Sequence, residues 1–202
     1  MKNIFLITII ASFLTFFPVN STYASNLDYN YISAGYVDAG DDIDGYSLEA
    51  SFGGSGTENG VYGRALGLFI SYGEDIGSVS AVATGDILFA NVGYHWSLSD
   101  TADILLEVGY IGADISATAC GYGSCYSESE SENGYNIMAG FRSGNPDGLE
   151  FKLLVGRGDL VEADTIGQLE VSYNFSETFS FQIGSFYDGD DNSTMVGFRY
   201  TF

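Results

Sequence analysis

The last seven residues of the chain, VGFRYTF, alternate between two kinds of side chain. A period of two places successive side chains on opposite faces of a strand, so this ending predicts a β-strand with two unlike faces. In a soluble sandwich, the final residue of a chain rarely carries so much aromatic surface. One face presents Val196, Phe198, Tyr200 and Phe202, and the other presents Gly197, Arg199 and Thr201.

The same alternation recurs along most of the chain, in segments separated by turn-rich stretches. Counting the ending, there are about ten such segments, and each is close to the roughly 9–11 residues that a tilted strand needs to cross a bilayer. Beyond the N-terminus, no stretch is long and apolar enough for a transmembrane helix. The earlier segments are 27–37, GYSLEASF, 61–72, 86–96, 103–112, YNIMAGFR, LEFKLLV, QLEVSYNF and FSFQIGSF.

The connections between these segments alternate in length. Those after the even-numbered segments are short, and those after the odd-numbered segments are longer and acidic. We expect the longest loop, from Ala113 to Asn133, to be the most exposed and mobile part of the protein. Short turns on one side and longer loops on the other are typical of outer-membrane barrels. We therefore predict an all-β fold, an antiparallel up-and-down transmembrane β-barrel of about ten strands with both termini on the side of the short turns.

The N-terminus, MKNIFLITIIASFLTFFPVNSTYA, has a lysine, an apolar run from Ile4 to Val19 and a small-residue ending with Thr22 and Ala24. This order is typical of a cleaved secretory signal peptide. A transmembrane anchor is the alternative, but the apolar run is short and lacks a basic flank. We predict a signal peptide over residues 1–24 and a barrel domain over residues 25–202.

Acidic residues outnumber basic residues by 27 to 6, which gives a formal net charge of −21. Such a chain repels nucleic acid, so nucleic-acid binding is excluded. Cys120 and Cys125 are compatible with an oxidising compartment. They frame CGYGSC in the longest predicted loop, where we predict a local disulfide, because a structural metal site usually needs four ligands.

Aromatic side chains divide between the two ends of the predicted strands. Two aromatic girdles around an apolar band are expected where amphipathic rings lie at the level of the lipid headgroups. The girdle at the loop ends comprises Tyr36, Tyr46, Tyr72, Tyr110 and Tyr135, and the girdle at the turn ends comprises Phe52, Trp96, Phe141, Phe151, Phe175, Phe179 and Phe202.

With its signal peptide, alternating segments and terminal aromatic residue, the chain resembles the small porin-like outer-membrane β-barrel family, of the OmpX/Ail and OmpA-transmembrane type. NYISAGYVDAG, NVGYHW and GFRYTF carry most of the likeness. The resemblance implies residence in the outer membrane of a Gram-negative bacterium, among its lipids and lipopolysaccharide. It also implies that Phe202 is an assembly signal read by the barrel-assembly machinery. The best-known members of the family have about eight strands, so eight is the alternative to ten.

The polar side chains that face inward should pair with one another, because an unpaired buried charge is costly. Small barrels are filled by side chains, so we predict a plugged or very narrow lumen, with a selective small pore as the alternative. Bulkier residues on the same faces are Phe69, Phe89, Met138 and Met195. The predicted polar set is Glu49, Asn91, His95, Glu107, Arg142, Glu150, Lys152, Gln168, Glu170, Gln182 and Arg199.

Three residues need a separate interpretation. His95, the single histidine, falls at the turn end, where a lumen or interface role fits better than a catalytic base, and no catalytic or cofactor-binding set is predicted. Arg64 and Arg157 break the alternation and fall on or near the lipid phase. Either their guanidinium groups reach the interface along the strand, or a bulge at a neighbouring glycine shifts the pattern.

Closure of the barrel should bring acidic residues of two distant loops to one part of the rim. Asp42 and Asp44 follow the first segment, and Asp188 and Asp190 precede the last. Oxygen ligands of this kind suit Ca²⁺ or Mg²⁺, so these four form a candidate weak cation site. A solvated acidic surface is the plainer interpretation.

The sequence therefore predicts a non-enzymatic integral outer-membrane barrel with acidic surface loops, which serves envelope structure or surface interaction. A narrow porin-like channel for small solutes is the first alternative. A soluble periplasmic or secreted β-barrel is the second.

Overall fold

The computed structural model describes residues 27–40, 43–54, 59–145, 147–160, 163–189 and 191–202. The predicted signal peptide lies outside these residues. No helix in the described part of the chain is long and apolar enough to span a membrane. The strands are β1 (Tyr31–Gly40), β2 (Ile43–Gly53), β3 (Asn59–Ile76), β4 (Val79–Ser99), β5 (Ala102–Gly121), β6 (Ser124–Gly144), β7 (Leu149–Asp159), β8 (Ala163–Asn174), β9 (Phe179–Asp188) and β10 (Asp191–Thr201).

The ten strands close into one antiparallel barrel in which each strand pairs with its neighbours in the chain and β1 pairs with β10. This confirms the predicted fold class and the count of ten. Tyr31 stands opposite Thr201, so the barrel wall begins and ends at the same end. We call this the turn end, and the opposite end, where β1 connects to β2, the loop end. The first strand begins at Tyr31 and not at Leu27, and the preceding Leu27 and Tyr29 are buried.

Side chains alternate between the outside of the barrel and its lumen, as the sequence predicts. On β4, for example, Leu88 and Val92 are about half exposed, whereas Phe89 and Asn91 between them are buried. A period of two on a closed sheet leaves one face for the surroundings and one for the core. The outer face is apolar, whereas the inner face carries the buried polar side chains together with a set of buried apolar ones.

The longest predicted loop is in fact two strands. Residues 113–121 continue β5 and residues 124–134 begin β6, and the two are joined by a tight turn at Tyr122 and Gly123, with φ of 52° and 82°. Hydroxyl pairs on neighbouring strands support this pairing, since Thr118 and Ser127 lie 2.9 Å apart. The prediction of a loop was wrong because small and polar residues here keep the period of two without large apolar side chains.

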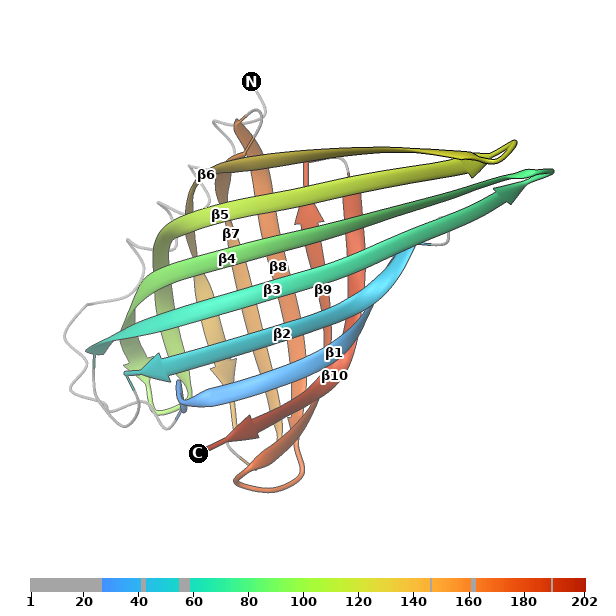
Figure 1. Cartoon of the computed structure of the whole chain (residues 1–202). Helices are drawn as coiled ribbons and strands as arrows, with labels where there is room; N and C mark the ends of the chain where they lie inside the picture. The colour runs from blue at the N-terminus through green and yellow to red at the C-terminus, as the bar shows by residue number, and fades with distance from the viewer. Residues whose placement is uncertain (1–26, 41–42, 55–58, 146, 161–162, 190) are drawn as a thin grey trace.

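The β3–β4 and β5–β6 hairpins extend past the other strands at the loop end (Figure 1). Together they form a four-stranded sheet that continues the barrel wall beyond the rim. We call residues 72–76, 79–86, 113–121 and 124–134 the projecting sheet. Tyr72, predicted to belong to the girdle at the loop ends, lies in this sheet instead.

Apolar side chains fill the lumen on the loop side of its polar residues. Phe89 and Phe186 meet edge to face at a centroid distance of 5.2 Å and lie at the centre of this layer. The buried apolar residues of this layer come from eight of the ten strands, all except β2 and β10. The fully buried apolar residues of this layer are Val37, Leu66, Leu68, Phe89, Ile111, Met138, Leu154, Ile166 and Phe186.

Candidate functional site

Arg64 lies at the centre of the lumen, where it joins three strands. Its Nε donates to Glu107 Oε2 at 3.0 Å, and its Nη1 donates to Glu49 Oε1 at 3.3 Å and to Gln168 Oε1 at 2.9 Å. Its placement near the lipid was therefore wrong. Small residues of β3 point outward, and Arg64 points into the lumen. Because side chains alternate along the strand, Phe69, which was predicted to face inward, points outward and is 43% exposed.

A second group of charges lies on the other side of the lumen. Lys152 Nζ is 3.2 Å from Glu49 Oε1 and 3.0 Å from Glu170 Oε2, so it links the two groups. Arg199 pairs with Glu170 and donates from Nη1 to Glu150 Oε1 at 2.8 Å. Charges contributed by β2, β7, β8 and β10 thereby form one connected network.

Arg142 extends this network toward the turn end. It grips Glu150 with two parallel hydrogen bonds of 2.9 Å, from Nε and Nη2, the bidentate geometry in which arginine binds carboxylates most strongly. Its Nη1 donates to the backbone carbonyl of Asp28 at 2.7 Å. The segment before β1 is therefore attached to the lumen charges.

The charges of the connected network balance. Within the connected network, four carboxylates meet four cations, and the fourth cation is Arg64, which was predicted to lie near the lipid. Asp103 lies outside this network, beside His95. Burying these ions is tolerable because each has an oppositely charged partner and further hydrogen bonds. The predicted polar lumen residues are all buried: Glu49, Asn91, His95, Glu107, Arg142, Glu150, Lys152, Gln168, Glu170, Gln182 and Arg199.

His95 lies at the turn end of the lumen, as predicted, and is fully buried. Its ring stacks on Tyr29 at a centroid distance of 4.5 Å, and its Nδ1 is 3.6 Å from Asp103 Oδ2. The Tyr29 hydroxyl donates to the same Asp103 oxygen at 2.7 Å. Tyr29 and Asp103 were not predicted as part of this site. The alternation within one strand shows neither that the segment before β1 enters the lumen nor that Asp103 on β5 lies beside His95 on β4. The arrangement closes the turn end of the lumen.

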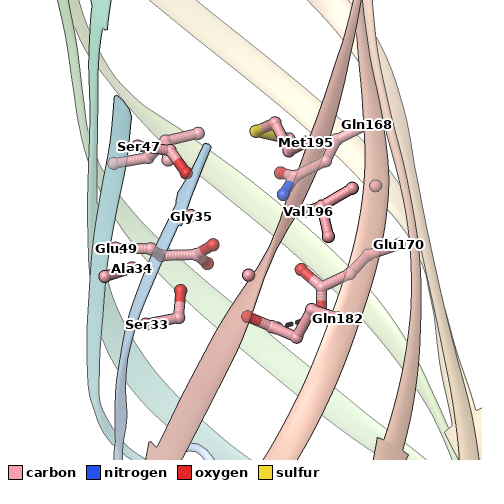
Figure 2. Close-up of a pocket in the computed structure, with 13 residues that line it drawn as sticks. Ser33, Ala34, Gly35, Ser47, Glu49, Gln168, Glu170, Gln182, Met195 and Val196 are labelled. Carbon is pink, nitrogen blue, oxygen red and sulfur yellow. Dashed lines mark hydrogen bonds between the residues drawn. The ribbon is translucent and has the colours of Figure 1, made fainter. Parts of the chain in front are cut away.

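Two small cavities lie within the barrel. The first, of about 30 Å³, is lined by Glu49, Gln168, Glu170 and Gln182 among others, whose polar ends converge on it (Figure 2). The second, of about 50 Å³ at the turn end, is lined by residues that include Arg142, Glu150 and Arg199. The two share no lining residue, and the Glu170–Arg199 ion pair stands between them. Each holds a few water molecules at most, since one water needs roughly 10–15 Å³.

The outer surface carries the aromatic girdles that the sequence predicts. At the loop end, Tyr36 stands opposite Tyr46 and Tyr110 opposite Tyr135, all of them exposed. At the turn end, the Phe202 ring lies between Phe52 and Tyr200, with centroid distances of 5.8 and 6.2 Å. The exposed phenylalanines of the turn-end girdle are Phe52, Phe141, Phe151, Phe175, Phe179 and Phe202, and Trp96 is half-buried among them.

Arg157 lies on the outside of β7 near the loop end, where the sequence placed it. In the described part of the chain it is the one basic residue that is exposed, because the other four are in the lumen. The outer surface is consequently acidic beyond what the net charge of the whole chain suggests.

Cys120 and Cys125 form the predicted disulfide, across the tip of the β5–β6 hairpin. They stand directly opposite each other in the register of the two strands. The bond therefore fastens the end of the projecting sheet.

The four aspartates of the candidate cation site do not form a described cluster. Asp42 and Asp190 lie outside the described residues. Asp44 stands opposite Asp38 and accepts a hydrogen bond from the Tyr36 hydroxyl at 3.0 Å. The described residues contain no group of three or more His, Cys, Asp or Glu side chains placed to hold a metal ion.

The strand register explains why Asp44 and Asp188, the two described members of the candidate site, lie apart. Asp38 pairs with Thr194 on β10, and Thr194 pairs with Ser185 on β9, so Asp44 is level with Ser185. Asp188 lies further along β9 toward the loop end. The cation site therefore remains a prediction that depends on residues outside the described ranges.

Solved structures of outer-membrane proteins match the chain over most of its length. Ail, the attachment invasion locus protein of Yersinia pestis, is 15% identical with a TM-score of 0.44, over 87% of this chain and 100% of that one. The KdgM porin is 11% identical with a TM-score of 0.41, over 85% and 99%. The translocator domain of the autotransporter NalP from Neisseria meningitidis is 12% identical with a TM-score of 0.45, over 86% and 88%. No family model and no curated protein sequence matches. The chain is similar in structure, at low sequence identity, to small outer-membrane β-barrels.

Proposed function

We propose that the protein is a non-enzymatic outer-membrane barrel with a closed lumen, which holds the projecting sheet outside the cell for contact with other molecules. The observation that carries this proposal is the filling of the lumen. A balanced ion network spans its centre, apolar side chains cover the network on the loop side, and Tyr29 with His95 closes the turn end. An interior built in this way supports a rigid wall and leaves the projecting sheet as the part available for contact.

Residence in the membrane is supported by the outer face of the barrel. Between the two girdles, the side chains that point outward are apolar or small, whereas Asp38, Asp86 and Asp114 mark the start of the acidic surface at the loop end. A closed barrel also leaves no unpaired backbone within the wall, which is the condition for crossing lipid with strands. Partners within the envelope would then be outer-membrane lipids and lipopolysaccharide, with the barrel-assembly machinery acting during insertion.

Two measurements test this proposal. The first is gel mobility with and without heating of protein taken from an outer-membrane fraction, where a folded barrel migrates differently from the heated chain. The second compares epitope tags inserted at the tip turn beside Gly123 and at the turn-end connection beside Asp147. Antibody should reach the first tag on intact cells and the second only after permeabilisation. Recovery of the protein in the soluble periplasmic fraction would contradict the proposal and favour a soluble barrel. The reverse pattern of tags would contradict the proposed placement of the projecting sheet outside the cell.

A further inference from the structure

The projecting sheet has one long unpaired edge. Residues 124–134 of β6 pair with β5 but with no other described strand, because the pairing of β6 with β7 begins at Tyr135, opposite Asp159. The edge on β3 is shorter, since β2 accompanies β3 as far as Ser71 and β3 ends at Ile76. An unpaired edge presents backbone N–H and C=O groups to which another strand can be added.

On the face that continues the outside of the barrel, two side chains of this edge already have partners within the sheet. Ser127 pairs with Thr118 on β5, and Ser131 donates to the Asp114 carboxylate on the same strand. These hydrogen bonds hold the hydroxyl face of β6 to its existing neighbour.

The face that continues the lumen is different. The side chains of Glu128, Glu130 and Glu132 make neither a hydrogen bond nor an ion pair within the part of the chain that the structure describes, and the first two residues are exposed. The residues opposite them on β5 have no polar side-chain group to offer: they are Ala117, Ile115 and Ala113.

A strand added to this edge would set its own side chains directly against the glutamate row. Opposite positions on paired strands bring their Cβ atoms to about 4.5–5.5 Å, where opposite charges stabilise the pair and like charges destabilise it. Tyr126 extends the row by one position and is 69% exposed, and a tyrosine ring also attracts a cation. All four positions therefore suit a partner with positive charge.

The same row disfavours a second copy of this chain as the partner. Antiparallel pairing of two β6 edges would place glutamates against glutamates. The β3 edge of another copy brings Glu74 and Asp75, which are acidic as well. Arg157, the one exposed base of the described residues, lies on β7 outside the projecting sheet.

We propose that the β6 edge binds an extended polypeptide segment that carries lysine or arginine at alternate positions. The segment pairs with residues 124–134 as an added strand and sets its cations against Tyr126, Glu128, Glu130 and Glu132. This inference rests on the proposed function, since the projecting sheet must be on the outside of the cell to meet such a partner.

The test uses the refolded full chain in nanodiscs of zwitterionic lipid and a capped peptide of about eleven residues in which lysine and threonine alternate. Calorimetric titration should detect binding, and amide hydrogen exchange should slow in residues 124–134. The E128Q/E130Q/E132Q variant should bind about tenfold more weakly. The matched variant E74Q/D75N/D86N removes the same number of charges from β3 and β4, and its affinity should change less than about twofold.

Three results would overturn the inference. An equal loss of peptide affinity in the two variants would show that the binding is general attraction between charges. Equal binding of a peptide with alternate N-methylated residues would exclude strand pairing, and unchanged exchange in residues 124–134 would place the peptide elsewhere. Each of these results leaves the proposed function standing if the tag beside Gly123 is exposed on intact cells, so the two failures are distinguishable.

Discussion

The basic residues of this chain are few, and nearly all of those described serve to balance carboxylates inside the barrel. Arg64 contacts Glu49, Glu107 and Gln168, and so connects β3 to β2, β5 and β8. A buried ion pair adds little net stability compared with well-packed apolar residues, because both ions lose their hydration. Removal of one partner is a different matter, because the remaining charge stays buried without compensation.

Arg64→Ala should therefore lower the free energy of unfolding by about 3–5 kcal/mol. The reason is that Glu107 and Glu49 would lose their shared cation in the lumen. Urea unfolding of the protein refolded into lipid vesicles measures the change. Arg157→Ala is the control, since it removes the same type of side chain from the outer surface, and it should change stability by less than about 0.5 kcal/mol. Similar losses in both variants would contradict the assignment of Arg64 to the network.

The terminal residue has a structural place of its own in the turn-end girdle. The Phe202 ring packs near Phe52 and Tyr200, and its backbone N–H donates to the Asn30 carbonyl at 3.1 Å. Thr201, its neighbour, points the other way along the alternation. Variants of Phe202 and Thr201 can therefore distinguish the effect of the terminal aromatic ring from the effect of any change near the chain end.

Deletion of Phe202, or Phe202→Asp, should reduce the amount of folded protein in the outer membrane several-fold, whereas Thr201→Asp should reduce it much less. The variant with a charged side chain at the level of the girdle lacks both the interfacial contacts of the Phe202 ring and the proposed assembly signal. Quantification of the heat-modifiable band in membrane fractions measures the yield. Equal yields from the Phe202 and Thr201 variants would remove the signal role.

The strands differ in how well the sequence predicts which of their residues face outward and which face the lumen. Strands with a clear contrast between faces, such as β7 with Phe151 outside and Lys152 inside, were predicted in the right phase. β3 was predicted in the wrong phase because its outer face holds glycine and alanine, while Leu66 and Leu68 face the lumen. Hydrophobicity alone cannot distinguish a lipid-facing leucine from one in the lumen. The neighbouring strands decide the phase, because Arg64 must meet Glu107.

The β6 strand changes its role at Gly134, where the barrel wall ends and the projecting sheet begins. A Cβ atom added at Gly134 would lie 1.3 Å from the Asp159 carbonyl oxygen, so the backbones of β6 and β7 approach each other more closely than any side chain allows. Glycine is used in strands at such close approaches. This residue therefore sets the point at which β7 leaves β6.

Gly134→Ala should destabilise the barrel by about 1–3 kcal/mol, because the backbones must move apart. Amide exchange should rise in β7 near Asp159, where pairing with β6 ends. Gly63→Ala is the matched control: its Cβ would meet no atom within 4 Å, and the variant should unfold at nearly the same urea concentration as the original. Loss of stability in the control alone would contradict this account of β6.

The whole molecule is a closed barrel whose interior is layered along its axis. The residue types of the central network could be predicted from the inward phase of the strands, and so could the need for pairing. The layer around Tyr29 could not, because it depends on the segment before β1 folding back into the lumen and meeting His95 and Asp103. The apolar layer was anticipated only at Phe89, Met138 and Met195, since an interior-facing leucine or isoleucine resembles a lipid-facing one in sequence.

The conductance of the refolded chain in planar bilayers tests the closed lumen most directly. Insertion is first verified by heat-modifiable mobility, and a general porin in the same membrane serves as the positive control. We expect no discrete current steps above the leak of the bare bilayer, because the ion network and the Phe89–Phe186 layer fill the lumen, and the two cavities found among the described residues are small and share no lining residue. Stable, ohmic steps that grow with salt concentration would contradict a closed lumen and favour the narrow channel for small solutes.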